Sequence, residues 1–184
     1  MKYKYLLNNK MEAIDIPYDY VEIILSTNCR NQYGRQYDIP KELFDSYLQK
    51  MKNMKLKYFQ SDFKEYINGD LHLIKKIEDN TVKETKLYNL IPVHINDNEN
   101  FRVVYYEKKK LSTIAYQSSR KQHSVCHKRK LIFRVNNKIY INFQQEICDE
   151  NIFHKIYINF NNSKDSDIKS IIETISDLIK MLQA

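Results

Sequence analysis

The residues best suited to do chemistry form a basic stretch, residues 108–145, that contains neither Asp nor Glu. Its cations are Lys108, Lys109, Lys110, Arg120, Lys121, Lys128, Arg129, Lys130, Arg134 and Lys138. Their combined charge of +10 exceeds the net charge of +7 of the whole chain. Clustered Lys and Arg bind phosphate groups through charge-assisted hydrogen bonds, and Arg does so in bidentate pairs. Interleaved aromatic side chains such as Tyr116 and Phe133 are able to stack on bases. The stretch therefore predicts either a site for RNA or another polyanion or a solvated basic hairpin, and the sequence leaves both open.

A second group of reactive side chains lies in the segment "HSVCH", which brings together His123, Cys126 and His127. A structural zinc site needs four ligands, and no second cluster accompanies this one, so the motif does not predict a metal site. Together with Cys29 and Cys148, the chain has three cysteines at wide spacings. This pattern does not predict a disulfide framework, and it fits a reducing compartment.

The composition excludes several classes of protein. Hydrophobic residues make up 42% and charged residues 29%, which is typical of a globular chain. The two glycines, Gly34 and Gly69, cannot form a Walker A loop, a Rossmann fingerprint or a nucleophile elbow. The first residues are basic but carry a very short apolar run, so we expect no signal peptide and an intracellular protein, in cytoplasm or nucleus. The abundance of Asn, Lys, Ile and Tyr indicates an AT-rich genome, such as that of a virus or a parasite.

The elements that would position these residues are mostly strands. Residues 18–26 alternate as a strand does, and Pro40 begins a helix near 40–54. From residue 56 to residue 160, short runs of Tyr, Phe, Ile and Val alternate with Asn, Asp and Lys turns. Apolar residues at helical spacing predict a final helix at 164–183. We expect a single α+β domain, 1–184, with an N-terminal extension at 1–17 and a core at 18–184.

The six letters KIYINF occur twice, at residues 138–143 and 155–160. In each copy the two Ile and the Phe point to one face, and Lys, Tyr and Asn point to the other. A strongly curved sheet or closed barrel would pack the apolar face under two outer helices and enclose the polar one. An open sheet would leave the polar face in water, and the period alone favours this second arrangement.

The order of these elements resembles the fungal and viral RNA 5′-triphosphatases, which belong to the triphosphate tunnel metalloenzymes. The resemblance covers about residues 18–183 through short motifs. It implies an antiparallel barrel around a tunnel. In that family, Glu-x-Glu pairs on the first strand and on a late strand hold a divalent metal, and Arg and Lys from other strands hold the triphosphate.

The acidic half of the family pattern is largely missing from this chain. Glu22 matches the first strand, but Ile24 stands where the second Glu is expected, and Tyr157 and Asn159 occupy the late pair. The segment "FRVVYYE" resembles the Phe-Arg strand of the family and supplies Glu107. Glu22 and Glu107 are thus the only candidate catalytic residues that the resemblance offers. A hard cation needs several charged oxygens, and neutral Tyr or Asn replaces them poorly.

The basic half of the pattern is present. The segment "HKRKLIFR" resembles the basic strand of the family, and each KIYINF copy begins with Lys. We expect phosphate or nucleic acid to be bound by Arg102, Lys128, Arg129, Lys130, Arg134, Lys138 and Lys155.

The resemblance implies a non-catalytic or weakly catalytic tunnel-like domain that binds RNA 5′-phosphates or assists an mRNA-capping or transcription enzyme. One alternative is a scaffold in a transcriptional or viral assembly, as Mediator head subunits resemble the same barrel and act as scaffolds. Another is an active RNA 5′-triphosphatase, and only this one requires Mg²⁺ or Mn²⁺. We otherwise expect no cofactor, no membrane association, and RNA, another polyanion or a protein as the partner.

Overall fold

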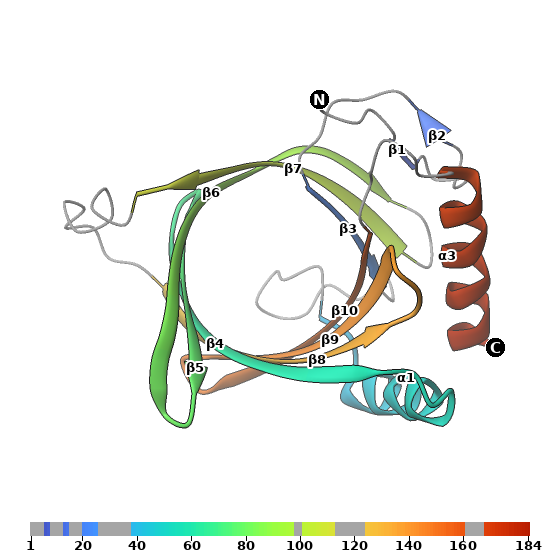
Figure 1. Ribbon diagram of the computed structural model, residues 1–184, viewed down its shortest axis with the longest axis horizontal. Helices are drawn as coiled ribbons and strands as arrows, with labels where there is room; N and C mark the ends of the chain where they lie inside the picture. The colour runs from blue at the N-terminus through green and yellow to red at the C-terminus, as the bar shows by residue number, and fades with distance from the viewer. Residues whose placement is uncertain are drawn as a thin grey trace.

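Eight antiparallel strands close into a barrel in this computed structural model (Figure 1). The structure describes residues 6–7, 13–14, 20–25, 38–97, 101–112, 124–160 and 168–184. Around the barrel the strands follow the order β10-β3-β7-β6-β5-β4-β8-β9, and β9 pairs with β10 to complete the ring. Their bounds are β3 (Tyr20–Leu25), β4 (Tyr58–Asn68), β5 (Leu71–Glu78), β6 (Thr81–Asp97), β7 (Phe101–Leu111), β8 (Ser124–Arg134), β9 (Ile139–Cys148) and β10 (Asn151–Phe160). Two short strands, β1 (Leu6–Leu7) and β2 (Ala13–Ile14), pair with each other apart from the barrel.

Tight turns connect neighbouring strands of the barrel. Asp79 and Asn80, between β5 and β6, both have positive φ, and so do Asp149 and Glu150 between β9 and β10. Two-residue hairpin loops with positive φ at both positions match the right-handed twist of the flanking strands. These turns place the side chains of consecutive strands in register across the barrel.

The two KIYINF copies lie side by side as β9 and β10. Ile139 pairs with Phe160, Ile141 with Ile158, and Phe143 with Ile156, and all six side chains are buried on the outer face. The expected curved sheet or closed barrel is confirmed, and the preference for an open sheet is wrong. Alternation of polar and apolar residues is the same whether the polar face meets bulk water or an enclosed polar interior, so the period could not distinguish the two.

Two helices cover this apolar outer face (Figure 1). Helix α1 (Lys41–Asn53) and helix α3 (Ile168–Gln183) confirm the predicted helices, and residues 164–167 lie outside the described residues. Among the described residues, no helix is long and apolar enough to cross a membrane. The outer core packs the helices against β3, β7, β9 and β10, with buried contributions from Val21, Ile23, Phe44, Met51, Val103, Ile141, Phe143, Ile156, Ile158, Ile171, Ile175, Leu178 and Leu182.

A disulfide joins Cys126 on β8 to Cys148 on β9. The sequence spacing of the three cysteines did not predict it. The two residues are direct partners in the β8–β9 register, and their Cα atoms are 4.5 Å apart. Strand register, rather than distance along the chain, brings them together. Cys29 lies outside the described residues.

Candidate functional site

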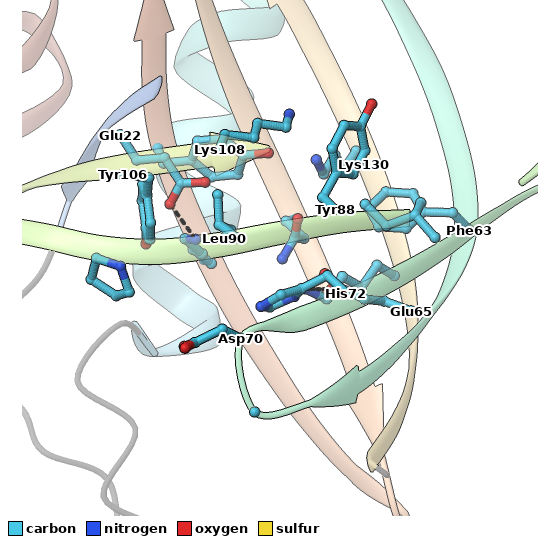
Figure 2. A pocket seen from close by; sticks show the side chains of 17 residues that line it. Glu22, Phe63, Glu65, Asp70, His72, Tyr88, Leu90, Tyr106, Lys108 and Lys130 are labelled. Carbon is cyan, nitrogen blue, oxygen red and sulfur yellow. Dashed lines mark hydrogen bonds and ion pairs between the residues drawn. The ribbon is translucent and has the colours of Figure 1, made fainter. Parts of the chain in front are cut away.

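A cavity of about 410 Å³ fills the interior of the barrel, and all eight strands contribute side chains to its wall. We call this cavity the lumen. Figure 2 shows Glu22, Glu65, Lys108 and Lys130 projecting into it from different strands. Its charged and aromatic lining consists of Glu22, Phe63, Glu65, Asp70, His72, Tyr88, Tyr106, Lys108, Lys128, Lys130, Lys155 and Tyr157.

One side of the lumen holds a buried chain of ion pairs centred on Lys128 of β8. Its ammonium contacts Glu65 of β4 and lies 3.2 Å from Oε1 of Glu146 on β9. The other oxygen of Glu65 lies 2.7 Å from Nδ1 of His72 on β5. Burial alone would raise the pKa of Glu65, yet Lys128 and His72 hold it well below its usual range. For Lys128, burial is outweighed by Glu146 and Glu65, which hold its pKa above the ordinary value.

A second ion pair lies across β10 and β3. Nζ of Lys155 donates a hydrogen bond of 2.8 Å to Oε2 of Glu22, and both side chains are largely buried. The same ammonium lies 4.6 Å from the centre of the Tyr157 ring. Burial, with Glu22 as the next cause, raises the pKa of Tyr157 well above its ordinary value, so its hydroxyl stays neutral.

Lys130 differs from the other two lysines. Its ammonium lies 4.8 Å from the centre of the Phe63 ring and 5.3 Å from that of Tyr157. Among the described residues it forms no ion pair with a carboxylate, whereas Lys128 and Lys155 do. Burial, followed by repulsion from Lys128, lowers the pKa of Lys130 to about 8. This amine is the cation of the lumen whose charge is least compensated by the described residues.

Lys108 adds a fourth lysine to the wall. Its ammonium lies 4.3 Å from the centre of the Tyr88 ring on the neighbouring strand β6. Burial lowers its pKa, although Glu22 acts in the opposite direction. Lysines therefore reach the lumen from β7, β8 and β10.

The structure brings only some of the predicted site residues into the lumen. Glu22, Lys128, Lys130 and Lys155 line it. Arg102, half-buried on β7, is the register partner of Ile24 and belongs to the same inner face as Glu22.

Two of the remaining predicted residues, Arg129 and Glu107, lie on the outer face because side chains alternate along a strand. The other two, Arg134 and Lys138, lie beyond the lumen at the end of β8 and in the turn that follows it. Arg129, between two lumen lysines, is exposed and lies 3.9 Å from Asp62. Glu107, between Tyr106 and Lys108, is likewise exposed. Arg134 is exposed at the end of β8, and Lys138 lies in the following turn, beside Ser170 and Thr174 of α3.

Sequence reasoning missed two lumen residues, Glu65 and His72, and also Glu146, which lies beside the lumen and contacts Lys128. Glu65 and His72 are seven residues apart on the hairpin β4–β5, and Glu146 faces Lys128 in the β8–β9 register. Alternation would have placed each on an inner face, but their meeting depends on strand register. No local pattern in the sequence indicates which of these side chains come into contact.

The carboxylates of the lumen do not fit the divalent metal that the resemblance implies. Glu22 binds the ammonium of Lys155, and Glu65 and Glu146 bind that of Lys128. At the late pair of the family pattern stand Tyr157, which is buried, and Asn159, whose side chain accepts a hydrogen bond from Asn142. A hard cation such as Mg²⁺ or Mn²⁺ requires several charged oxygens, and here the ammonium groups of Lys128 and Lys155 compete with it for these carboxylates.

Comparison with known proteins reveals similarity in structure only. A scan with models of protein families finds no match, and a search of the curated proteins finds none either. The S. pombe RNA triphosphatase Pct1 matches with a TM-score of 0.60 and 15% identity, over 91% of this chain and 82% of Pct1. The RNA triphosphatase domain of a trifunctional mimivirus mRNA capping enzyme matches with a TM-score of 0.61 and 9% identity, over 90% of this chain and 89% of that domain. Pct1 has also been solved in complex with the Spt5 CTD, and that structure matches with a TM-score of 0.57 and 14% identity, over 91% of this chain and 83% of that one. The chain therefore has the triphosphate tunnel fold of the fungal and mimivirus RNA triphosphatases, as its sequence resemblance implied.

Proposed function

We propose that the lumen binds the phosphate groups of an RNA 5′ end or a similar polyphosphate, and that it does so without hydrolysing them. The observation that carries this proposal is Lys130. Its ammonium lies in the lumen between two aromatic rings, with no carboxylate at ion-pair distance among the described residues.

A phosphate oxygen is the ligand that this environment favours. A buried ammonium without a counter-charge is destabilising, and an anion brought close to it restores the balance. Hydrogen bonds to charged groups contribute about 1.5–3 kcal/mol each. Lys108 lines the same cavity and supplies further positive charge to a ligand with several phosphates, whereas Lys128 and Lys155 are paired with carboxylates.

The pairing of the acids supports binding without catalysis. Hydrolysis at a tunnel site needs a metal to neutralise developing charge and free carboxylates to hold that metal. Glu22 and Glu65 in the lumen, and Glu146 beside it, each contact a lysine. An active triphosphatase is therefore the less favoured alternative. In a cell, a phosphate-binding domain of this kind would assist a separate capping or transcription enzyme.

The neighbours Lys130 and Arg129 provide a matched test, since one lies in the lumen and the other is exposed on the outer face. We expect Lys130→Met to weaken binding of a short 5′-triphosphate RNA about tenfold, the effect of losing one charge-assisted hydrogen bond. Arg129→Met should leave the preference for 5′-triphosphate over 5′-hydroxyl RNA unchanged. Binding is measured by fluorescence anisotropy at several salt concentrations. Equal affinity of the wild type for the two RNA ends would refute the proposal.

A scaffold is the second candidate, and a group of exposed apolar side chains favours it. Met54, Tyr58 and Phe59, near the junction of α1 and β4, are 44%, 57% and 54% exposed. Exposed aromatic residues of this kind are common at protein interfaces. This role predicts that the chain associates with a protein partner even at high salt, and that Tyr58→Ser and Phe59→Ser abolish the association. Association that is sensitive to salt and unaffected by these two changes would oppose it.

A further inference from the structure

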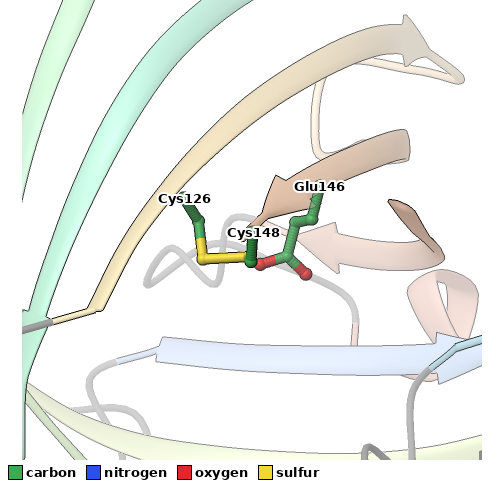
Figure 3. Close-up of side chains that lie close together, drawn as sticks. All are labelled: Cys126, Glu146 and Cys148. Carbon is green, nitrogen blue, oxygen red and sulfur yellow. A yellow bond between two sulfur atoms is a disulfide. The ribbon is translucent and has the colours of Figure 1, made fainter. Parts of the chain in front are cut away.

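Near the ion-pair chain of Lys128, two sulfur atoms and a carboxylate lie close together (Figure 3). Cys126 and Cys148 are direct register partners on β8 and β9, and Cys126 also pairs with Glu65 of the lumen across β4. Because opposed residues share a face, both cysteines belong to the inner face of the barrel. They are buried, with 0% and 6% exposure.

Glu146 completes this cluster. It precedes Cys148 by two residues on the same strand, so its side chain lies on the same face. The two sulfur atoms and a carboxylate oxygen of Glu146 all lie within 4.8 Å of one another. The phenyl group of Phe153 packs against the two cysteines.

The disulfide is one of two states that this cluster can adopt. A dithiol reductant attacks one sulfur, and after exchange the reductant is the cyclic disulfide while Cys126 and Cys148 are thiols; two electrons and two protons pass to the protein. The reduced pair then offers two soft sulfur donors beside one carboxylate.

We propose that reduced Cys126 and Cys148 bind Zn²⁺ together with Glu146, at a site on the inner face of the barrel whose fourth position is open. Binding breaks the two S–H bonds, forms two Zn–S bonds and releases two protons to solvent. Tetrahedral zinc is held by thiolate and carboxylate ligands, and sites with three protein ligands leave one position for water or another ligand. Soft sulfur donors select Zn²⁺ over Mg²⁺ or Mn²⁺.

The surrounding charge supports this assignment. Zn²⁺ with two thiolates and one carboxylate has a net charge of about −1. The ammonium of Lys128, 3.2 Å from Glu146, supplies the compensating positive charge. The site also differs from the segment "HSVCH", because His127 is the residue between Cys126 and Lys128 and so lies on the outer face.

Cobalt is the probe for this site, because thiolate–Co²⁺ bonds give a charge-transfer absorption that oxygen ligands do not. The full chain carrying Cys29→Ser is reduced, freed of excess reductant without air, and titrated with Co²⁺ and then with Zn²⁺. We expect one Co²⁺ per chain with the thiolate band, displaced by Zn²⁺, and no band before reduction. Glu146→Gln should weaken binding about tenfold or more, a loss that even outer-shell changes produce. The exposed Glu150→Gln is the matched control and should bind as the parent does.

Two results would overturn the proposal: no thiolate band in the reduced Cys29→Ser chain, or a band that persists when Cys126 and Cys148 are both replaced by Ser. If the serine variants fail to fold, alkylation of the reduced Cys29→Ser chain decides instead. Zn²⁺ should slow the labelling of Cys126 and Cys148 about tenfold or more, and unchanged labelling would equally exclude the site. This outcome is separate from phosphate binding, which rests on Lys130.

Discussion

At the scale of single residues, the lumen owes its character to how each lysine is paired. Lys128 and Lys155 neutralise buried carboxylates, and Lys130 is surrounded by aromatic rings. The first two keep the barrel interior stable and close to neutral. The buried charge of Lys130 lowers the free energy of unfolding, and a bound anion would remove this destabilisation.

The charge on Lys130 predicts an unusual dependence of stability on pH. Burial lowers its pKa from 10.5 in the unfolded chain to about 8 in the folded protein. Between these values the unfolded chain binds more protons, so this residue makes the free energy of unfolding rise with pH in that window. We expect Lys130→Met to stabilise the protein below about pH 8 and to flatten the rise above it.

Urea unfolding at about pH 7 and about pH 10 measures this effect. The exposed Lys109→Met is the control, and it should follow the wild-type pH dependence. If the free energies of unfolding of the wild type and of Lys130→Met differ by the same amount at both pH values, the Lys130 amine is not desolvated.

Lys128→Met should convert a lysine-bridged pair of acids into a cation site. Removing one partner of a buried ion pair typically costs about 3–5 kcal/mol, so the variant should be less stable. Mn²⁺ should then recover part of the loss by binding Glu65 and Glu146, raising the thermal midpoint of the variant more than that of the wild type.

The double variant Lys128→Met with Glu65→Gln tests the origin of this response. It lacks Lys128, as the single variant does, and it also lacks one of the two carboxylates. The rise in thermal midpoint caused by Mn²⁺ should therefore shrink towards the wild-type value. A response that stays the same in the double variant would mean that the metal binds elsewhere.

At the scale of elements, the sequence predicted which face of each strand is apolar but not which strands meet. The KIYINF copies were assigned correct inner and outer faces from alternation alone, and the final helix was recognised from the spacing of Ile171, Ile175 and Leu178. Contacts across strands were not predictable in this way. The Cys126–Cys148 bond and the Glu65–Lys128–Glu146 group arise from register, which tertiary structure determines. The alternation of polar and apolar residues also could not distinguish a polar lumen from a polar surface.

Docking of α3 on the outer face is testable with one substitution. Ile175 is fully buried in the outer core. Ile175→Asp would place a charge there without a partner, at a cost of several kcal/mol, comparable to a total stability of about 5–15 kcal/mol. We therefore expect the variant to be unfolded or to melt at a much lower temperature by circular dichroism. Glu173→Ala, on the exposed side of the same helix, should melt close to the wild type.

At the scale of the whole molecule, the described part of the chain has the tunnel fold, and lysines contact Glu22, Glu65 and Glu146 of its inner face. We expect no phosphate release from 5′-triphosphate RNA or nucleoside triphosphates in the presence of Mg²⁺ or Mn²⁺, measured with a phosphate assay on the purified chain. The opposing result is specific: metal-dependent release that Glu22→Gln abolishes and the exposed Glu107→Gln does not. Such release would reinstate the triphosphatase assignment.

The closure of the barrel has a consequence for the order in which the chain folds. Strand β3 pairs with β7 on one side and β10 on the other, and both of these partners lie far from it in the sequence. The hairpins from β4 to β7 and from β8 to β10 can form locally, but β3 must wait for partners synthesised much later. Loop-closure entropy makes such distant pairing slow. During synthesis, one edge of the strand that carries Glu22 therefore stays unpaired until β10 emerges from the ribosome, and its apolar face is covered fully only when α3 follows.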